Sequence, residues 1–493
     1  MVSVLVVAAL LRVWSLGSAP LIITNDGYWY LHWAQESLKS GSMHLPPYRT
    51  PGYPLFLASV FGVWGMGPTG VLLAQQGLSL LTALMITWAG CRLGGARWGL
   101  VAGLLAAIDP LQMAMAHYLL TETLATALLA LAAGILLATD CRWPRLVLLG
   151  LTIAGVVLVR PSFQCLAPAF ALALVFTGSS MRQRFMRPVI FAAVFLAAMA
   201  PWVLRVHHKY GSWRVAESTT AQLWHGVCKA GLLKTDYPLP PEMQSAFDRM
   251  VAPHPNEGAY MDFFVQARGW DPKVARIMTD WAIQSIRERP REYARAAAYA
   301  CLWQLDLFPP TGPTVVNDTQ YLVRRLTQYI ERKDGLGPNM QISEPDPGTE
   351  PLTMRQRIGP GTWLYRVWAG MEYPGLVRLP LFACACAAIV LGALRGKWAI
   401  VVVFAGTIGF GLAHALALQW ASRYSLPCWA VWPLALPVLK RLWEERRTRG
   451  AWMRATDAGA VSERASTLTL AGYGSASADF VEVRVRDSKC TPA

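Results

Sequence analysis

Residues 119–139 read LLTETLATALLALAAGILLAT, and this stretch decides the class of the protein. It carries one charged side chain, Glu122, and its other side chains are almost all apolar. About 20 consecutive apolar residues are long enough to cross the hydrocarbon core of a bilayer as an α-helix. A second block, residues 190–204 (IFAAVFLAAMAPWVL), has no charged residue. Such blocks predict a polytopic membrane protein of the all-α class.

The composition of the whole chain agrees with this class. Of its 493 residues, 54% are hydrophobic and 15% are charged, whereas an ordinary soluble domain has about 25% charged residues. The formal net charge of +15 would fit a nucleic-acid partner, but the lysines and arginines cluster at the ends of the apolar blocks, as the positive-inside rule expects. We therefore expect the lipid bilayer as a partner and no nucleic acid.

The apolar blocks predict about ten membrane-spanning helices. They lie at about residues 1–17, 69–91, 98–116, 120–139, 145–159, 162–178, 188–206, 374–394, 398–418 and 424–440. The first block lacks the basic start of a cleaved signal peptide, so we expect it to remain as the first helix.

Basic residues occur at every second junction between these blocks, which predicts the orientation of the chain. The clusters are Arg92/Arg97, Arg142/Arg145, Arg182/Arg184/Arg187, Arg395/Lys397 and Lys440/Arg441/Arg446/Arg447/Arg449. We expect these ends and both termini in the cytoplasm, in a multi-pass protein of the plasma (inner) membrane. Residues 18–68, 207–373 and 419–423 then face the extracytoplasmic side.

Four parts follow from this pattern. They are an N-terminal transmembrane module at 1–206 with a first outer loop at 18–68, an extracytoplasmic loop and interfacial-helix region at 207–373, the last transmembrane helices at 374–440, and a disordered cytoplasmic tail at 441–493. An amphipathic helix at Tyr28–Leu38 should lie along the membrane surface. Residues 258–267 and 273–288 read as helices, and 292–308 as an interfacial helix, with a pair of extra spans as the alternative.

Two carboxylates stand where chemistry at the outer face could use them. Asp26, in Asn25-Asp26-Gly27-Tyr28, follows the first predicted span. A carboxylate at that depth can take a proton from a hydroxyl or hold a metal, and the alternative is a helix cap. Glu122 opens the fourth predicted span, where a carboxylate is favoured by the helix dipole, so capping is again the alternative.

Arginines at the outer ends form the second group of candidates. Arg49 lies in the proline-rich return PPYRTPGYP at residues 46–54, where its fork of donors could meet a phosphate, or where it could anchor the chain at the interface. Arg160, Arg205 and Arg423 also stand where the positive-inside rule disfavours them. A bound anion is the functional explanation, and snorkelling to lipid headgroups is the alternative.

Five motifs in order, over about residues 1–440, resemble the C-type (GT-C) integral membrane glycosyltransferases. The branch that they resemble is that of the protein O-mannosyltransferases and aminoarabinose transferases, glycosyltransferase family 39-like. The motifs are Asp26 with the return Arg49-Thr50-Pro51-Gly52-Tyr53-Pro54-Leu55, Thr121-Glu122, Arg160-Pro161, Pro201-Trp202 to Arg205, and Arg423-Tyr424 to Pro427. Gly27 stands where that branch often has a second carboxylate.

The resemblance implies a GT-C-type bundle of about ten transmembrane helices, with an amphipathic first outer loop and a larger outer region before the last three spans. It implies inverting transfer of a sugar from a polyprenyl-phosphate donor to an acceptor (lipid, glycan or protein) on the extracytoplasmic face. Asp26 would be the general base, and arginines would stabilise the departing phosphate. The residues implied to bind the donor phosphate or substrate are Arg49, Tyr53, Glu122, Arg160, Arg205, Arg423 and Tyr424.

No cofactor is required if arginines neutralise the phosphate, and nothing in the sequence supports a divalent metal. The nine cysteines include no CxxC pair, so neither a disulfide framework nor a zinc site is indicated. No motif identifies the acceptor.

Two other functions fit parts of the pattern. An O-antigen-ligase-like or polymerase enzyme would place its essential residues in 207–373 rather than at Asp26. A transporter or flippase without transferase activity would show matched, interrupted helices in its two halves, and the chain has no convincing internal repeat.

Overall fold

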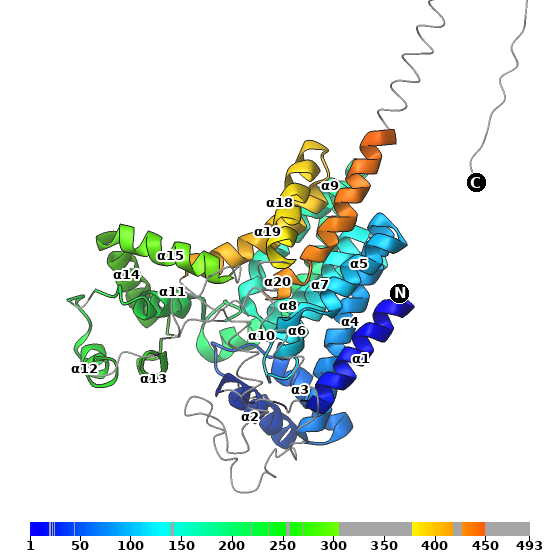
Figure 1. Ribbon diagram of the computed structural model, residues 1–493. Helices are drawn as coiled ribbons and strands as arrows, with labels where there is room; N and C mark the ends of the chain where they lie inside the picture. The colour runs from blue at the N-terminus through cyan, green and yellow to red at the C-terminus, as the bar shows by residue number, and fades with distance from the viewer. Residues whose placement is uncertain are drawn as a thin grey trace, which may run out of the picture. The chain divides into compact units, whose positions relative to one another are not determined.

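The computed structural model describes residues 1–18, 21, 23, 25–43, 45–138, 140, 142–216, 218–234, 236–252, 257–269, 271–304, 377–417 and 426–448. Every regular element within these ranges is a helix, as Figure 1 shows, and the predicted all-α class is thereby confirmed. The motif at Arg423-Tyr424, residues 305–376 of the outer region and the tail from 449 onward lie outside the described residues.

Ten apolar helices are found within the described residues. Three of them, within the described residues, are long and apolar enough to cross a bilayer, at Thr69–Gly94, Met181–Tyr210 and Trp398–Leu416. The shorter ones are Val2–Leu16, Gly52–Trp64, Ala96–Ala107, Glu122–Ala138, Trp143–Val159, Pro161–Thr177 and Leu379–Leu394. Nine of the ten fall on predicted spans, and Gly52–Trp64 does not.

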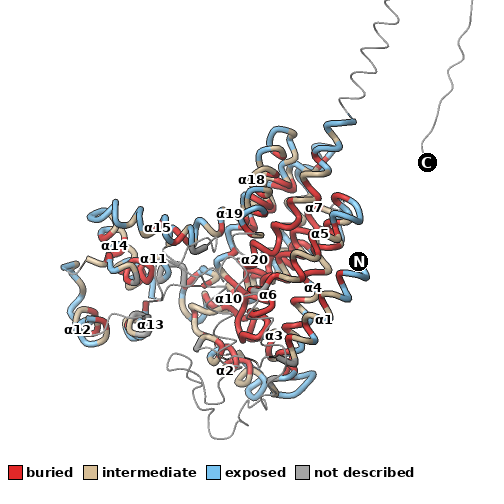
Figure 2. The backbone as a smooth tube through the Cα atoms, in the orientation of Figure 1, coloured by how far each residue is buried: buried red, intermediate tan, exposed pale blue. Residues whose placement is uncertain are grey.

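The helices themselves have the following bounds. They are α1 (Val2–Ser18), α4 (Pro68–Gly94), α5 (Ala96–Ala107), α7 (Glu122–Ala138), α8 (Trp143–Val159), α9 (Leu166–Thr177), α10 (Met181–Tyr210), α18 (Leu379–Leu394) and α19 (Trp398–Leu416). Figure 2 shows that the buried backbone concentrates along α4 and α7, which pack against each other. Small side chains of α7, Ala125, Ala130 and Ala133 among them, are almost wholly buried, which lets helices approach closely without a water-driven hydrophobic effect.

The predicted span at 98–116 is wrong as one helix. Helix α5 ends at Ala107, and a six-residue helix, α6 (Pro110–Met115), follows. The break is Asp109-Pro110, because a proline disfavours helical geometry in the residue before it. The Asp109 carboxylate caps α6 by accepting from the backbone N–H groups of Leu111 and Gln112, and it pairs with Arg378, just before α18, at 3.1 Å.

The predicted span at 424–440 is also interrupted. Its described part begins with α20 (Leu426–Trp429), continues through the 3-10 turn η4 (Trp432–Leu434), and becomes α-helical from residue 435. Pro433 lies in the first turn of η4, and its missing N–H favours the start of a new helical segment over continuation of the old one.

The predicted first outer loop contains two helices. The amphipathic helix is present as α2 (Asn25–Ser40), whereas α3 (Gly52–Trp64) is an apolar helix that we did not predict. The prolines around it indicated a rigid loop, but Pro51 precedes α3 and Pro54 lies in its first turn, where proline costs no hydrogen bond. The two helices pack together through a buried cluster that includes Tyr30, Trp33, Tyr53 and Leu57.

Gly52 sets how closely α3 approaches α8. A Cβ atom added to Gly52 would lie 2.7 Å from the carbonyl carbon and oxygen of Leu158 and from the backbone nitrogen of Val159. These are main-chain atoms at the end of a helix, and they cannot turn aside as a flexible side chain can. The absence of a side chain at Gly52 therefore brings the segment around Arg49 close to Arg160.

The described part of the predicted outer region forms a helical module with its own core. Its helices are α11 (Ser218–Lys229), α12 (Pro241–Met250), α13 (Glu257–Gln266), α14 (Pro272–Glu288) and α15 (Pro290–Gln304). Trp224, Phe263, Met278 and Trp281 are buried at its centre. Helices α13 and α14 agree with the predicted helices at 258–267 and 273–288, and α15 covers the described part of 292–308.

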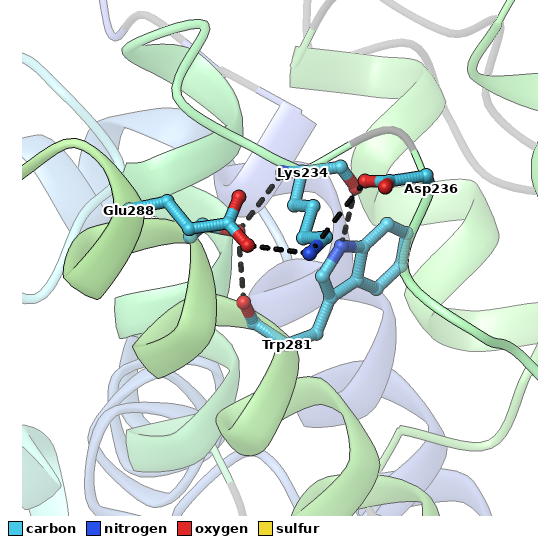
Figure 3. Close-up of polar contacts among 5 residues, drawn as sticks. Lys234, Asp236, Trp281 and Glu288 are labelled. Carbon is cyan, nitrogen blue, oxygen red and sulfur yellow. Dashed lines mark hydrogen bonds and ion pairs between the residues drawn. The ribbon is translucent and has the colours of Figure 1, made fainter.

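The segment after α11 is fixed to α14, as Figure 3 shows. The indole Nε1 of Trp281 donates to the carbonyl oxygen of Lys234 at 2.7 Å, and the backbone N–H of Lys234 donates to Ser285 Oγ at 2.9 Å. Lys234 Nζ also pairs with Glu288 and lies 3.8 Å from Asp236. Such surface ion pairs add little, so the buried contacts of Trp281 carry most of this attachment.

The close approach at Gly52 generates a prediction. Gly52→Ala should lower the free energy of unfolding by about 1–3 kcal/mol, because overpacking against backbone forces the helices apart. Gly62→Ala is the matched control, since Gly62 lies in the same helix and a Cβ atom added there would meet no heavy atom within 4 Å. Thermal unfolding of both purified variants in one detergent measures the difference. Equal stability of the two variants would contradict the packing role of Gly52.

Candidate functional site

Asp26 and Arg49, which lie 23 residues apart in the sequence, form an ion pair. Asp26 lies in the first turn of α2, and Arg49 lies in the turn before α3. Nη2 of Arg49 donates to Oδ1 of Asp26 at 2.6 Å, and Nη1 donates to the hydroxyl oxygen of Tyr30 at 3.0 Å. The Asp26 side chain keeps 44% of its surface exposed, so a second molecule can reach its carboxylate.

The groups around Arg49 fix the position of its guanidinium and favour its charged form. Its backbone N–H donates to the carbonyl of Pro46 at 3.1 Å, and its guanidinium lies 5.4 Å from the ring centre of Tyr30 and 6.0 Å from that of Tyr48. Burial alone would lower the pKa of Arg49, but Tyr30 and Asp26 outweigh it, and the pKa is raised. Burial raises the pKa of Tyr30 and of Tyr48, so both phenols stay neutral beside the guanidinium.

A second ion pair joins Glu122 and Arg160. Nη1 of Arg160 lies 3.1 Å from Oε1 of Glu122, and the side chains are 10% and 4% exposed respectively. Glu122 opens α7, and Arg160 ends α8 in an extended conformation, φ −139° and ψ 103°, which the following Pro161 favours. Two buried charges of opposite sign hold the ends of these helices together, because separating them would leave each one uncompensated in a medium of low dielectric constant.

Tyr30 connects the first ion pair to a buried cluster near the second. Its hydroxyl accepts from Arg49 at 3.0 Å, and Leu124, in the first turn of α7, and Leu158, near the end of α8, pack against the cluster that contains its ring. The helix ends that carry Glu122 and Arg160 therefore lie near this cluster. Tyr30 itself was not predicted. Its spacing from Asp26, four residues along a helix, places both on one face, and this is the signal that could have identified it.

Tyr53, the fifth predicted residue of this group, lies beside Tyr30. The two rings meet edge to face with their centres 5.2 Å apart. Tyr53 is fully buried, and its hydroxyl donates to Oε1 of Gln75 at 2.8 Å. Tyr53 thus supports Tyr30 from the protein side, whereas Asp26 and Arg49 lie on the partly exposed side.

Arg205 contacts a different part of the same loop. Its Nη2 donates to the carbonyl oxygen of Met43 at 2.6 Å, and its guanidinium lies 5.0 Å from the ring centre of Trp202. The hydroxyl of Tyr210 donates to the carbonyl of Leu45 at 3.1 Å. These contacts tie the C-terminal end of α10 to the loop between α2 and Arg49.

The last two predicted residues, Arg423 and Tyr424, lie outside the described residues. The end of their motif is described: α20 packs against α19 and against α7, the helix that Glu122 opens.

This arrangement combines two chemical capacities. A partly exposed carboxylate can accept a proton, and guanidinium groups can hold a phosphate through paired hydrogen bonds. Among the described residues, no group of three or more His, Cys, Asp or Glu side chains is placed to hold a metal ion.

The buried pair yields a stability prediction. Glu122→Gln should lower the free energy of unfolding by about 3–5 kcal/mol, because removing one partner leaves the other charge buried and uncompensated. Asp140→Asn is the control, since Asp140 pairs with Arg142 and Arg145 at an exposed position and should cost less than about 1 kcal/mol. Denaturant titration in mixed micelles measures both. A Glu122→Gln protein as stable as Asp140→Asn would refute a stabilising role of the pair.

No protein-family model matches this chain, and no curated protein matches it in sequence. Solved structures do resemble it. ArnT from Cupriavidus metallidurans is 15% identical, over 90% of this chain and 77% of that chain, with a TM-score of 0.38. The archaeal oligosaccharyltransferase AglB from Archaeoglobus fulgidus is 15% identical, over 93% of this chain and 51% of that chain, with a TM-score of 0.46. The chain spans about half the length of AglB.

Proposed function

We propose that this protein transfers a sugar from a polyprenyl-phosphate donor to a hydroxyl group of an acceptor at the extracytoplasmic face of the plasma membrane. The observation that carries the proposal is the presence of two ion pairs, Asp26–Arg49 and Glu122–Arg160, on segments that pack against the buried cluster containing Tyr30. One exposed carboxylate and two guanidiniums are the groups that transfer from a lipid phosphate needs, a base on one side and positive charge on the other.

The proposed reaction is an in-line displacement. The acceptor hydroxyl donates a hydrogen bond to the carboxylate of Asp26, and its oxygen attacks the anomeric carbon of the sugar. The bond between that carbon and the phosphate oxygen breaks, and the phosphate leaves with the electron pair. Asp26 takes the hydroxyl proton, and the sugar is inverted because attack and departure are on opposite faces. Arg49 and Arg160 offset the charge that grows on the phosphate.

The contact between Arg49 and Asp26 implies an order of events, in which the donor binds before Asp26 acts as the base. Arg49 occupies Oδ1 of Asp26 at 2.6 Å, so this oxygen can accept from an acceptor hydroxyl only when the guanidinium moves. A donor phosphate competes for the same guanidinium. In our proposal, Arg49 turns toward the phosphate while remaining bonded to Tyr30, and Oδ1 of Asp26 then accepts from the acceptor hydroxyl.

The location of the charges favours this proposal over an O-antigen-ligase-like mechanism. All four residues of the two ion pairs belong to the N-terminal module at 1–206 and not to 207–373. The donor class agrees with the ligands in the solved structures that resemble the chain, which include ArnT bound to undecaprenyl phosphate and AglB in complex with an inhibitory peptide and a dolichol phosphate. The acceptor can be a lipid, a glycan or a protein.

The role of Asp26 is tested by Asp26→Asn. The amide can still accept from Arg49 but cannot take the proton, so we expect the fold to be kept and transfer to fall by about 10²–10⁴-fold. Glu36→Gln is the matched control, because Glu36 is a carboxylate on the same helix whose contact with His32, at 3.7 Å, is a long and exposed one. Release of polyprenyl phosphate from a panel of polyprenyl-phosphate sugars is measured in proteoliposomes. Full activity of Asp26→Asn would sink the assignment of the base.

The proposed orientation is tested with reporter fusions. Fusions after Gly211, at the end of α10, and after Gly396, between α18 and α19, lie on opposite faces if the basic residues around α18 and α19 stay in the cytoplasm. An alkaline phosphatase reporter, active only outside, should give signal after Gly211 and none after Gly396. The reverse pattern would place the Asp26 site on the cytoplasmic face.

A further inference from the structure

Two adjacent glutamines, Gln75 and Gln76, are buried in the N-terminal third of α4, with exposed fractions of 0% and 3%. An amide buried in an apolar helix bundle is costly unless its hydrogen bonds are made. The two glutamines have different partners, and only Gln75 is bonded to a residue of the proposed site.

Gln75 makes three hydrogen bonds with good geometry. Its Nε2 donates to the backbone carbonyls of Ala116 and Tyr118 at 3.1 and 3.0 Å, and its Oε1 accepts from the hydroxyl of Tyr53 at 2.8 Å. The orientation of the amide follows from these partners, because carbonyl oxygens can only accept and therefore face the NH₂ group. A fixed amide of this kind connects two segments that lie 63 residues apart, at Tyr53 and Ala116.

One end of this connection leads to Glu122. Ala116 and Tyr118 lie in the short segment between α6, which ends at Met115, and α7, which begins at Glu122. Carbonyls at the end of a helix have no partners within the helix, and Gln75 supplies donors for two in this segment. The position of the segment sets where α7 begins, and thus where Glu122 meets Arg160.

The other end leads to Asp26. Tyr53, held by Gln75, packs edge to face against Tyr30, whose hydroxyl accepts from Arg49. The path from Gln75 to Arg49 therefore runs through two buried aromatic rings, both of them in one cluster. Close-packed interiors transmit displacements rather than absorb them, so a shift of Tyr53 moves Tyr30 and Arg49.

We infer that Gln75 is a positioning residue, which holds the Asp26–Arg49 pair and the Glu122–Arg160 pair at a fixed separation. This inference rests on the proposed transferase function. Gln75 has no exposed surface with which to reach a substrate. It aligns the base, Asp26, with the guanidinium of Arg160, and alignment of this kind acts on the chemical step more than on binding.

Gln75→Met tests the inference, with Gln76→Met as the matched control. Methionine keeps the approximate volume and the apolar surroundings while removing all three hydrogen bonds. Gln76 is the neighbouring residue, and its amide bonds to His117 at 3.1 Å and Ser15 at 3.5 Å rather than to Tyr53. Both variants therefore lose buried hydrogen bonds in the same span, and they differ in their connection to the site.

We expect kcat of Gln75→Met to fall by about 10–100-fold, with KM for donor and acceptor changed by less than about 3-fold, because small misplacements reduce the rate of the chemical step. Gln76→Met should keep kcat within about 3-fold of the unaltered protein at a comparable loss of thermal stability, since it leaves alignment intact. Tyr53→Phe, which removes one hydroxyl, should reproduce part of the kcat loss, and the double variant Tyr53→Phe/Gln75→Met should lose no more than Gln75→Met alone.

The possible outcomes distinguish the positioning role of Gln75 from the proposed transferase function. An equal loss of kcat in Gln75→Met and Gln76→Met, or a loss confined to KM, would overturn the positioning role while leaving the transferase function standing. If the unaltered protein releases no carrier phosphate from any polyprenyl-phosphate sugar, the proposed function fails, and this inference fails with it. If Gln75→Met does not fold, full kcat in Tyr53→Phe overturns the inference.

Discussion

Opposite charges buried at the ends of α7 and α8 constrain the rest of this protein. Glu122 and Arg160 are almost fully enclosed, and neither charge can be left alone in a medium that solvates ions poorly. The ends of the two helices must therefore lie together, which fixes the position of the end of α8. The backbone of α8 at Leu158 and Val159 packs against α3 at Gly52. This contact places the loop that carries Arg49 next to the end of α8.

Helix α2, which precedes the loop that carries Arg49, supplies the other residues of the first ion pair's surroundings. It brings Asp26 and Tyr30 on one face, so that Arg49 can bond to both with the two arms of its guanidinium. Arginine is suited to this contact because its donors form a rigid planar fork, which a lysine lacks. The candidate site thus consists of two ion pairs, with Tyr30 bonded to the arginine of the first. These residues belong to the loop, to α2 and to the ends of two helices.

The charged residues of the candidate site could be singled out from the predicted topology. Asp26 and Arg49 lie in the first predicted outer loop, Glu122 opens a predicted span, and Arg160 stands where the positive-inside rule disfavours it. Gln75 was not singled out, because a neutral residue within a helical pattern carries no signal of position and its partners are distant in sequence. Tyr30 was missed, although its spacing of four residues from Asp26 places both on one helix face. Helix α3 was also missed, because its prolines indicate a loop unless their place in the first turn is known. The break at Asp109-Pro110 could have been predicted, because that dipeptide both caps and interrupts helices.

The ion pair of Asp109 with Arg378 has a consequence for the order of synthesis. The two residues are separated by 269 positions, and at a translation rate of about 5–20 residues per second Arg378 emerges roughly 13–54 s after Asp109. During that interval the carboxylate has its bonds to the backbone of α6 but not this arginine. The first seven predicted spans are thus made and inserted before the cation that pairs with Asp109 exists. The segment that precedes α18 supplies a cation to the N-terminal module, and in a nascent chain that stops short of Arg378 the carboxylate of Asp109 keeps its bonds to the backbone of α6 but lacks this ion pair.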